Sequence, residues 1–229
     1  MKTIGLLGGM SWESTALYYR LINEETRRRL GGLHSAPVLL HSFDFHEIER
    51  LQTLGDWPAA AERLASAAKG LERAGADFLL ICTNTMHKVA EEVATAVNIP
   101  LLHLAEATAE RIMAAGFDKV GLLGTRYTME QEFYTGRLRQ AGIDVRIPGA
   151  DRRAMVNRVI YEELCHGVVR ETSREAFLET IGELVANGAQ AIIEGCTEIG
   201  LLVNESHTDV PLFDTTRIHA EQAVAFALE

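Results

Sequence analysis

Residues 191–198 read Ala191-Ile192-Ile193-Glu194-Gly195-Cys196-Thr197-Glu198, a short apolar run that ends in a glycine, a cysteine and a threonine. The chain contains a second version of this stretch at residues 78–85, Phe-Leu-Leu-Ile-Cys-Thr-Asn-Thr. A Gly-Ala pair stands at the same distance before each version, and counting from that pair aligns Thr83 with Cys196.

A second pair of blocks repeats in the same order. Gly5-Leu6-Leu7-Gly8 returns as Gly121-Leu122-Leu123-Gly124, and an aromatic pair follows each copy. Two blocks repeated at nearly equal offsets indicate an internal duplication. We therefore predict two similar halves related by a pseudo-twofold, in which the loops after equivalent strands face each other across a cleft. In this arrangement Thr83 and Cys196 lie opposite each other.

Short apolar runs alternate with amphipathic helical stretches through both halves. This alternation predicts an α/β protein, each half a mostly parallel sheet flanked by helices, with ligands at the carboxyl edge of the strands. We predict a first domain of residues 1–100 plus 210–229 and a second of residues 101–209. The predicted strands are residues 2–7, 38–43, 78–82, 100–104, 120–123, 145–147, 191–193 and 211–213. The predicted helices are residues 12–30, 56–75, 106–115, 129–140, 152–166, 173–186 and 215–228.

Composition restricts the class of partner. The 229 residues carry a formal net charge of −10, which argues against a nucleic-acid or anionic-membrane surface because both need clustered Lys and Arg. No apolar run approaches the roughly 20 residues of a membrane span, and the first residues lead directly into a strand. We expect a cytoplasmic protein that binds a small molecule.

The three cysteines, Cys82, Cys165 and Cys196, are odd in number and lack metal-ligand spacing, so they predict neither a disulfide framework nor a zinc site. Cys196 is the candidate catalytic thiolate, because amides at a helix start lower a cysteine pKa from about 8.5. A free cysteine is more often a small buried residue. The repeat and the polar neighbours favour function at Cys196, whereas we interpret Cys82 and Cys165 as structural.

Polar side chains gather at the two strand ends. The hydroxyls of Thr83, Thr85 and Thr197 and the amide of Asn84 form a neutral hydrogen-bonding set, for which helix capping is the alternative role. His87 and Glu198 are candidates to orient the two reacting groups, and the alternative for both is a solvated first turn. Arg50 and Gln52 lie in a predicted loop before Asp56, where a surface role is expected.

Three motifs carry a family resemblance: Gly5-Leu6-Leu7-Gly8-Gly9-Met10, Thr83-Asn84-Thr85-Met86-His87 and Gly195-Cys196-Thr197-Glu198. With them the chain resembles the aspartate/glutamate racemase family of cofactor-independent amino-acid racemases over nearly its whole length. That family uses two cysteines on opposite faces of the substrate, one as a base and one as an acid. Thr83 stands where the family usually has the first cysteine, and a hydroxyl is a far weaker acid than a thiol.

The resemblance to the subgroup with this Thr/Cys pair implies an L-aspartate/L-glutamate-specific racemase. Cys196 would deprotonate the L-enantiomer and Thr83 would protonate the opposite face. The resemblance also implies that no cofactor or metal is needed and that the chain forms a homodimer. The substrate pocket that it implies is lined by Met10, Gln52, Thr83, Asn84, Thr85, Thr197 and Glu198.

Two other functions stay open on sequence alone. A related single-cysteine decarboxylase would need only Cys196, although the polar run after residue 82 suits its apolar substituent poorly. A catalytically silent amino-acid-binding protein would explain Thr83 as decay of the site.

Overall fold

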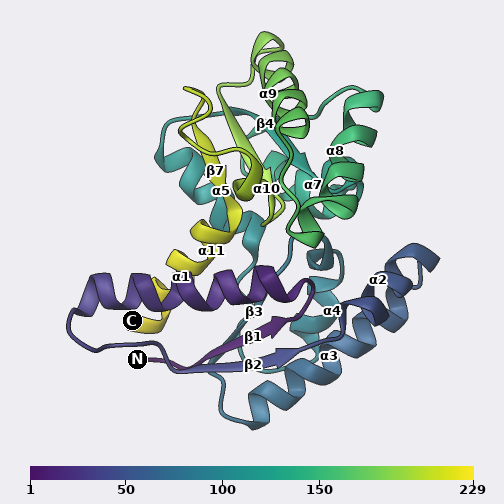
Figure 1. Cartoon of the computed structure of the whole chain (residues 1–229). Coiled ribbons are helices and arrows are strands. Elements are labelled where there is room, and N and C mark those ends of the chain that lie inside the picture. The colour runs from purple at the N-terminus through teal and green to yellow at the C-terminus, as the bar shows by residue number, and fades with distance from the viewer. The chain divides into compact units, whose positions relative to one another are not determined.

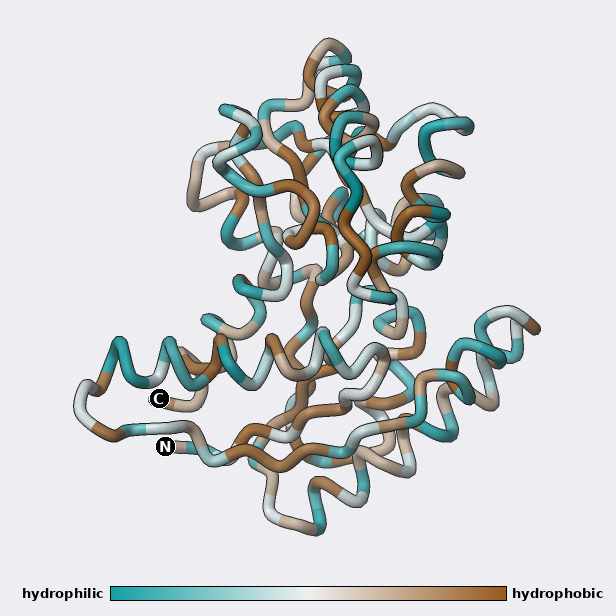
Figure 2. The backbone as a smooth tube through the Cα atoms, viewed as in Figure 1, coloured by the Kyte–Doolittle hydropathy of each residue, from teal (hydrophilic) through white to brown (hydrophobic).

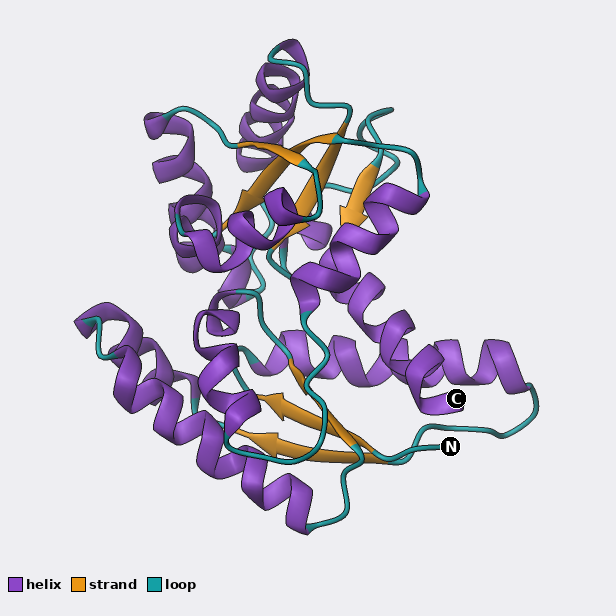
Figure 3. Cartoon of the chain, turned by 180° about the vertical axis from the view of Figure 1, so that it is seen from behind, coloured by secondary structure: helices purple, strands orange, loops and turns teal.

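The computed structural model describes residues 1–229 as two compact α/β units (Figure 1). The first unit comprises Met1–Leu104 and His219–Glu229, and the second comprises Ala105–Ile218. Each contains a parallel β-sheet with helices packed against it (Figure 3). The predicted α/β fold class is confirmed. No helix of the chain is long and apolar enough to cross a membrane.

The first unit has a three-stranded sheet in the order β2-β1-β3. All of its strand pairs are parallel. The strands are β1 (Ile4–Gly8), β2 (Val38–Ser42) and β3 (Phe78–Ile81). The helices are α1 (Trp12–Leu30), α2 (Phe45–Leu54), α3 (Trp57–Arg73), the 3-10 helix η1 (Thr85–Val89), α4 (Ala90–Thr95) and, over most of its length, α11 (Thr215–Leu228).

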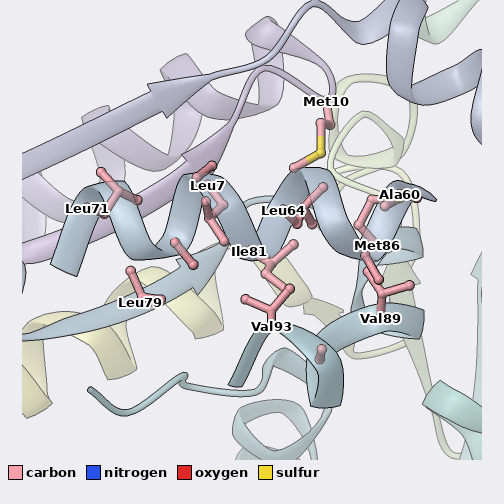
Figure 4. Close-up of a cluster of buried hydrophobic side chains, with 14 of the residues drawn as sticks. Leu7, Met10, Ala60, Leu64, Leu71, Leu79, Ile81, Met86, Val89 and Val93 are labelled. Carbon is pink, nitrogen blue, oxygen red and sulfur yellow. The ribbon is translucent and has the colours of Figure 1, made fainter. Parts of the chain in front are cut away.

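Strand alternation gives this sheet two apolar faces. The hydrophobic residues of its strands are brown stretches of the tube in Figure 2. Leu7 and Ile81 pack against α3 and α4 in one buried cluster, shown in Figure 4. Leu6 and Leu80 point the other way, into a cluster with Tyr18 and other residues of α1 and α11. Cover on both faces explains why β1 and β3 are fully buried and continuously apolar, whereas the edge strand β2 ends in the exposed His41 and Ser42.

The second unit has a four-stranded parallel sheet in the order β5-β4-β6-β7. Its strands are β4 (Lys119–Gly124), β5 (Asp144–Arg146), β6 (Ala191–Gly195) and β7 (Leu212–Asp214). Its helices are α5 (Leu104–Ala114), α6 (Arg126–Glu130), α7 (Glu132–Gln140), α8 (Ala150–Glu162), the 3-10 helix η2 (Leu164–His166), α9 (Glu171–Ala186) and α10 (Ile199–Leu202).

The repeated blocks form the same strand pair in both units. Gly5 pairs with Leu79 in the first sheet, and Gly121 pairs with Ile192 in the second. A Cβ on Gly5 would lie 2.7 Å from Cδ2 of Leu79, and one on Gly121 would lie 2.5 Å from Cδ1 of Ile192. Each glycine therefore makes room for the side chain of its partner strand, which explains why the motif recurs.

Two local predictions differ from the structure. Residues 100–104 form no strand, because only Leu101 bridges to Leu79 before α5 begins at Leu104. The predicted loop that contains Arg50 and Gln52 is the helix α2. Asp44 caps the start of this helix by accepting from the backbone N–H of His46, and a left-handed Gly55 ends it.

Candidate active site

Cys196 directly follows β6 at the carboxyl edge of the second unit's sheet. Its Sγ donates a hydrogen bond to Oε2 of Glu198 over 3.0 Å. Glu198 is buried, while Cys196 is partly exposed. The thiol therefore lies beside a carboxylate that can accept its proton.

Cys196 is a thiol in the resting protein. Its pKa is raised well above the ordinary value, chiefly because burial disfavours the thiolate and next because the Glu198 carboxylate repels it. The prediction that helix amides stabilise a resting thiolate is therefore wrong. The following helix, α10, has four residues and begins only at Ile199, so it provides little field at the sulfur.

The other cysteines differ in environment. Cys82 is fully buried in the apolar cluster that lines α1 and α11, and burial strongly raises the pKa of its thiol. The structural interpretation of Cys82 is confirmed. Cys165 lies in η2 and is partly exposed, so it does not belong to the buried core.

Thr83 lies at the carboxyl edge of the first unit's sheet, after β3 and Cys82, and is partly exposed. Its carbonyl oxygen lies 2.8 Å from Nδ1 of His87. The backbone N–H of Leu104 donates to Nε2 of His87 over 3.2 Å, so Nε2 is an acceptor. The proton of a neutral His87 is then on Nδ1, which donates to Thr83. His87 is buried, so the alternative of a solvated first-turn side chain is wrong for it.

Two further histidines surround His87 in the first unit. Its ring centroid lies 4.6 Å from that of His103 and 5.8 Å from that of His219. His219 is buried between Tyr18, whose hydroxyl lies 2.9 Å from Nδ1, and the Leu102 carbonyl, 3.0 Å from Nε2. Burial lowers the pKa of His219 to about 3, so this ring is neutral at pH 7.

Gln52 and Met10 are both buried in the first unit. Gln52 donates from Nε2 to the sulfur of Met86 over 3.0 Å, so the expected surface role of Gln52 is wrong. Met10 belongs to the apolar cluster of Figure 4, beside Leu7 and Leu64. Arg50 is exposed, as the sequence predicts.

The remaining polar candidates lie next to Thr83 and Cys196 in the chain. Asn84 and Thr85 are buried at the start of η1, and the Asn84 side chain makes no capping hydrogen bond to that helix. Thr197 is partly exposed between Cys196 and Glu198. Each unit thus brings together the site residues predicted within it: Thr83, Asn84, Thr85 and His87 in the first, and Cys196, Thr197 and Glu198 in the second.

The sequence analysis missed Glu194 as a residue of interest. Its carboxyl is buried in β6, and burial followed by the charges of Asp214 and Glu205 raises its pKa to about 8. A single charged residue directly after the apolar run 191–193, and still within the strand β6, was the available signal. Among residues 1–229, no group of three or more His, Cys, Asp or Glu side chains is arranged to hold a metal ion.

Residues 7–223 match the model of the Asp/Glu/Hydantoin racemase family. The chain belongs to this family. It is 24% identical to the broad specificity amino-acid racemase RacX of Bacillus subtilis, over 97% of this chain and 96% of RacX. The family resemblance stated from the sequence motifs is confirmed.

Solved structures agree with this membership. A crystal structure from Yersinia pestis, provisionally named an Asp/Glu racemase, is 57% identical, with a TM-score of 0.94 and complete coverage of both chains (100% each). An aspartate racemase homologue from Pyrococcus horikoshii OT3 is 34% identical, with a TM-score of 0.88 and again 100% coverage of each. The chain therefore has the two-unit α/β fold of Asp/Glu racemases.

Proposed function

We propose that this family member racemises acidic amino acids, L-glutamate and L-aspartate, without pyridoxal or another cofactor. Cys196 removes the α-proton of the L-enantiomer, and Thr83 delivers a proton to the opposite face. The observation that carries the proposal is the hydrogen bond from Sγ of Cys196 to Oε2 of Glu198. It provides an acceptor for the thiol proton, which must leave before the sulfur can act as a base.

Racemisation of the L-enantiomer takes two proton transfers at Cα, one on each face. On substrate binding, Glu198 takes the thiol proton, and the resulting thiolate of Cys196 removes the hydrogen from Cα. The electron pair left on Cα is delocalised into the α-carboxylate, whose growing charge is stabilised by hydrogen-bond donors. Thr83 then donates its hydroxyl proton to the other face of Cα. Solvent reprotonates its alkoxide, and Glu198 releases to solvent the proton that it took from the thiol, which restores the resting state.

The neutral polar set provides the substrate contacts in this proposal. Thr85, Thr197 and the amide of Asn84 bind the α-carboxylate and the ammonium, together with nearby backbone N–H groups. Gln52, Met10 and Glu198 complete the pocket that the resemblance implies. Burial of Asn84, Thr85 and Gln52 supports this assignment, because buried polar side chains are held in fixed positions by their partners.

The Thr/Cys pair makes the two directions unequal in turnover. In the D-to-L direction Thr83 must act as the base, and a hydroxyl is a much poorer proton acceptor than a thiolate. Since the enantiomers have equal free energy, kcat/KM must be the same in both directions. We therefore expect a lower kcat from the D-enantiomers, compensated by a lower KM.

The test is a circular-dichroism time course of pyridoxal-free protein with L- and D-glutamate and L- and D-aspartate. We expect the L-isomers to lose optical activity, Cys196→Ser to be inactive, and Thr83→Cys to raise kcat from the D-isomers. Thr95→Cys, at an exposed position on α4, is the control for an added thiol and should leave kcat unchanged. Binding of any of these four substrates without turnover, or a Thr83→Cys rate equal to that of Thr95→Cys, contradicts the assignment.

Deuterium exchange separates racemisation from the two other functions. In D2O, L-glutamate should acquire deuterium at Cα, and Cys196→Ala should abolish that exchange. Deuterium exchange that persists in Cys196→Ala would show that the Cys196 thiol is not the base. Release of carbon dioxide from an arylmalonate would favour the decarboxylase. We also propose a cytoplasmic homodimer, for which light scattering in solution should give the mass of two chains.

A further inference from the structure

A cavity of about 720 Å³ lies within the second unit, apart from the predicted catalytic residues. Its walls come from α5, β6, α10 with the loop that follows it, β7 and the first turn of α11. Cys196, Thr197 and Glu198 are not among the lining residues. Its volume is in the range of small-molecule sites.

Glu194 is the unusual residue of this wall. Only 5% of it is exposed, and its Oε1 has no hydrogen-bond partner. Burial of a carboxyl oxygen without a donor is costly, and in folded proteins such atoms nearly always have a partner. Glu194 lines the cavity, so a ligand there lies next to this residue.

The negative charges of Asp214 and Glu205, beside Glu194, favour a ligand whose hydrogen-bond donor is positively charged. Asp214 and Glu205 also line the cavity, and both raise the pKa of Glu194 through their negative charge, after the larger effect of burial. An ammonium group would neutralise this cluster and donate to the carboxyl of Glu194. The carboxylates are not arranged to hold a metal ion, so an organic cation is the better match.

The same cavity contains positive charge. Arg111 and Arg217 line it, and Arg217 is exposed and makes no ion pair within residues 1–229. A simple amine has no anionic group that could accept hydrogen bonds from a guanidinium group. A ligand that carries a carboxylate beside its ammonium would satisfy both kinds of charge, since guanidinium binds carboxylate in a bidentate manner.

The rest of the wall combines the polar side chains of Asn204 and Ser206 with apolar ones, among them Val203, Leu212 and Phe213. We propose that the cavity binds a free α-amino acid with an aliphatic side chain, its ammonium on Glu194 and its carboxylate on Arg217. This site is separate from the Thr83 and Cys196 chemistry. It does not depend on whether the chain is a racemase.

The test is isothermal titration of the full chain with L-leucine and with two analogues that each lack one charged group, isopentylamine and isocaproate. We expect L-leucine to bind and each analogue to bind at least about tenfold more weakly, since each loses one charge-assisted contact. Cys196→Ala should bind L-leucine as the wild type does. Loss of binding in Cys196→Ala would move the ligand to the catalytic site and overturn the proposal.

Two variants test the individual contacts. Glu194→Gln and Arg217→Gln should each weaken L-leucine binding by about tenfold or more. The matched controls are Glu163→Gln, a buried carboxyl of the second unit outside the cavity, and Arg158→Gln, an exposed arginine of α8. Arg217 is at the surface, so its variant should fold even if Glu194→Gln does not. No binding of L-leucine at millimolar concentration, or equal affinity in Arg217→Gln and Arg158→Gln, overturns the proposal.

Discussion

Glu198 accepts a hydrogen bond from the thiol of Cys196, two residues earlier in the chain, with 3.0 Å between Oε2 and Sγ. The same carboxylate raises the pKa of that thiol and is the hydrogen-bond acceptor for its proton. A purely structural contact and a catalytic one therefore predict different results when the carboxylate is removed.

Glu198→Gln should lower kcat/KM for L-glutamate by about a hundredfold, because it removes the acceptor for the thiol proton. The same change should lower the pKa of Cys196, because it removes the negative charge that opposes the thiolate. The pH dependence of iodoacetamide alkylation, followed by mass spectrometry of the Cys196 peptide, measures the pKa. Glu162→Gln, exposed near the end of α8, is the control. A fall in rate without a shift in the alkylation midpoint would indicate a structural role alone.

His87 holds the Thr83 carbonyl and the Leu104 amide with its two ring nitrogens. His87→Ala should lower the free energy of unfolding by about 2–4 kcal/mol, because it removes these two hydrogen bonds and opens a cavity. Urea unfolding measures the loss, with His34→Ala at an exposed position as the comparison. Equal stability of the two variants would show that these contacts contribute nothing.

Gly9 has a φ of 85°, and a Cβ at this position would lie 2.3 Å from the Phe43 carbonyl oxygen. Gly9→Ala should therefore cost about 3 kcal/mol or more, through both the backbone strain and the clash. Gly182 lies within α9 with open space around its Cα, so Gly182→Ala should instead stabilise by about 1 kcal/mol. Thermal melting of both variants checks the pair, and the same sign of change in both would contradict this account.

The repeat in the sequence predicted more of the fold than the local patterns did. It led to two α/β units, and the structure pairs Gly5 with Leu79 and Gly121 with Ile192 at corresponding places. The glycine recurs in the sequence because the same requirement recurs in both units: a Cβ would meet the side chain of the partner strand.

The electrostatic state of the candidate site did not follow from the sequence. The motif places Cys196 before a helix, but the length of α10, the burial of the thiol and the direction of the Glu198 side chain are set by packing. Gln52 was misplaced for the same reason, since its burial depends on Met86, a residue distant in sequence. Only three-dimensional contacts decide such properties.

The carboxyl of Glu194 should make the protein less stable as the pH rises. Its pKa is raised from 4.5 to about 8 in the folded chain, first by burial and then by Asp214 and Glu205. Between these values the unfolded chain has released this proton while the folded chain keeps it, so unfolding becomes easier with increasing pH. From pH 5.5 to 7.5 this group should remove roughly 2–3 kcal/mol of stability, an effect that Glu194→Gln lacks. Urea unfolding at both pH values, with Glu163→Gln as the control, measures the difference. An equal pH dependence in the wild type and in Glu194→Gln would show that the carboxyl is already ionised in the folded chain.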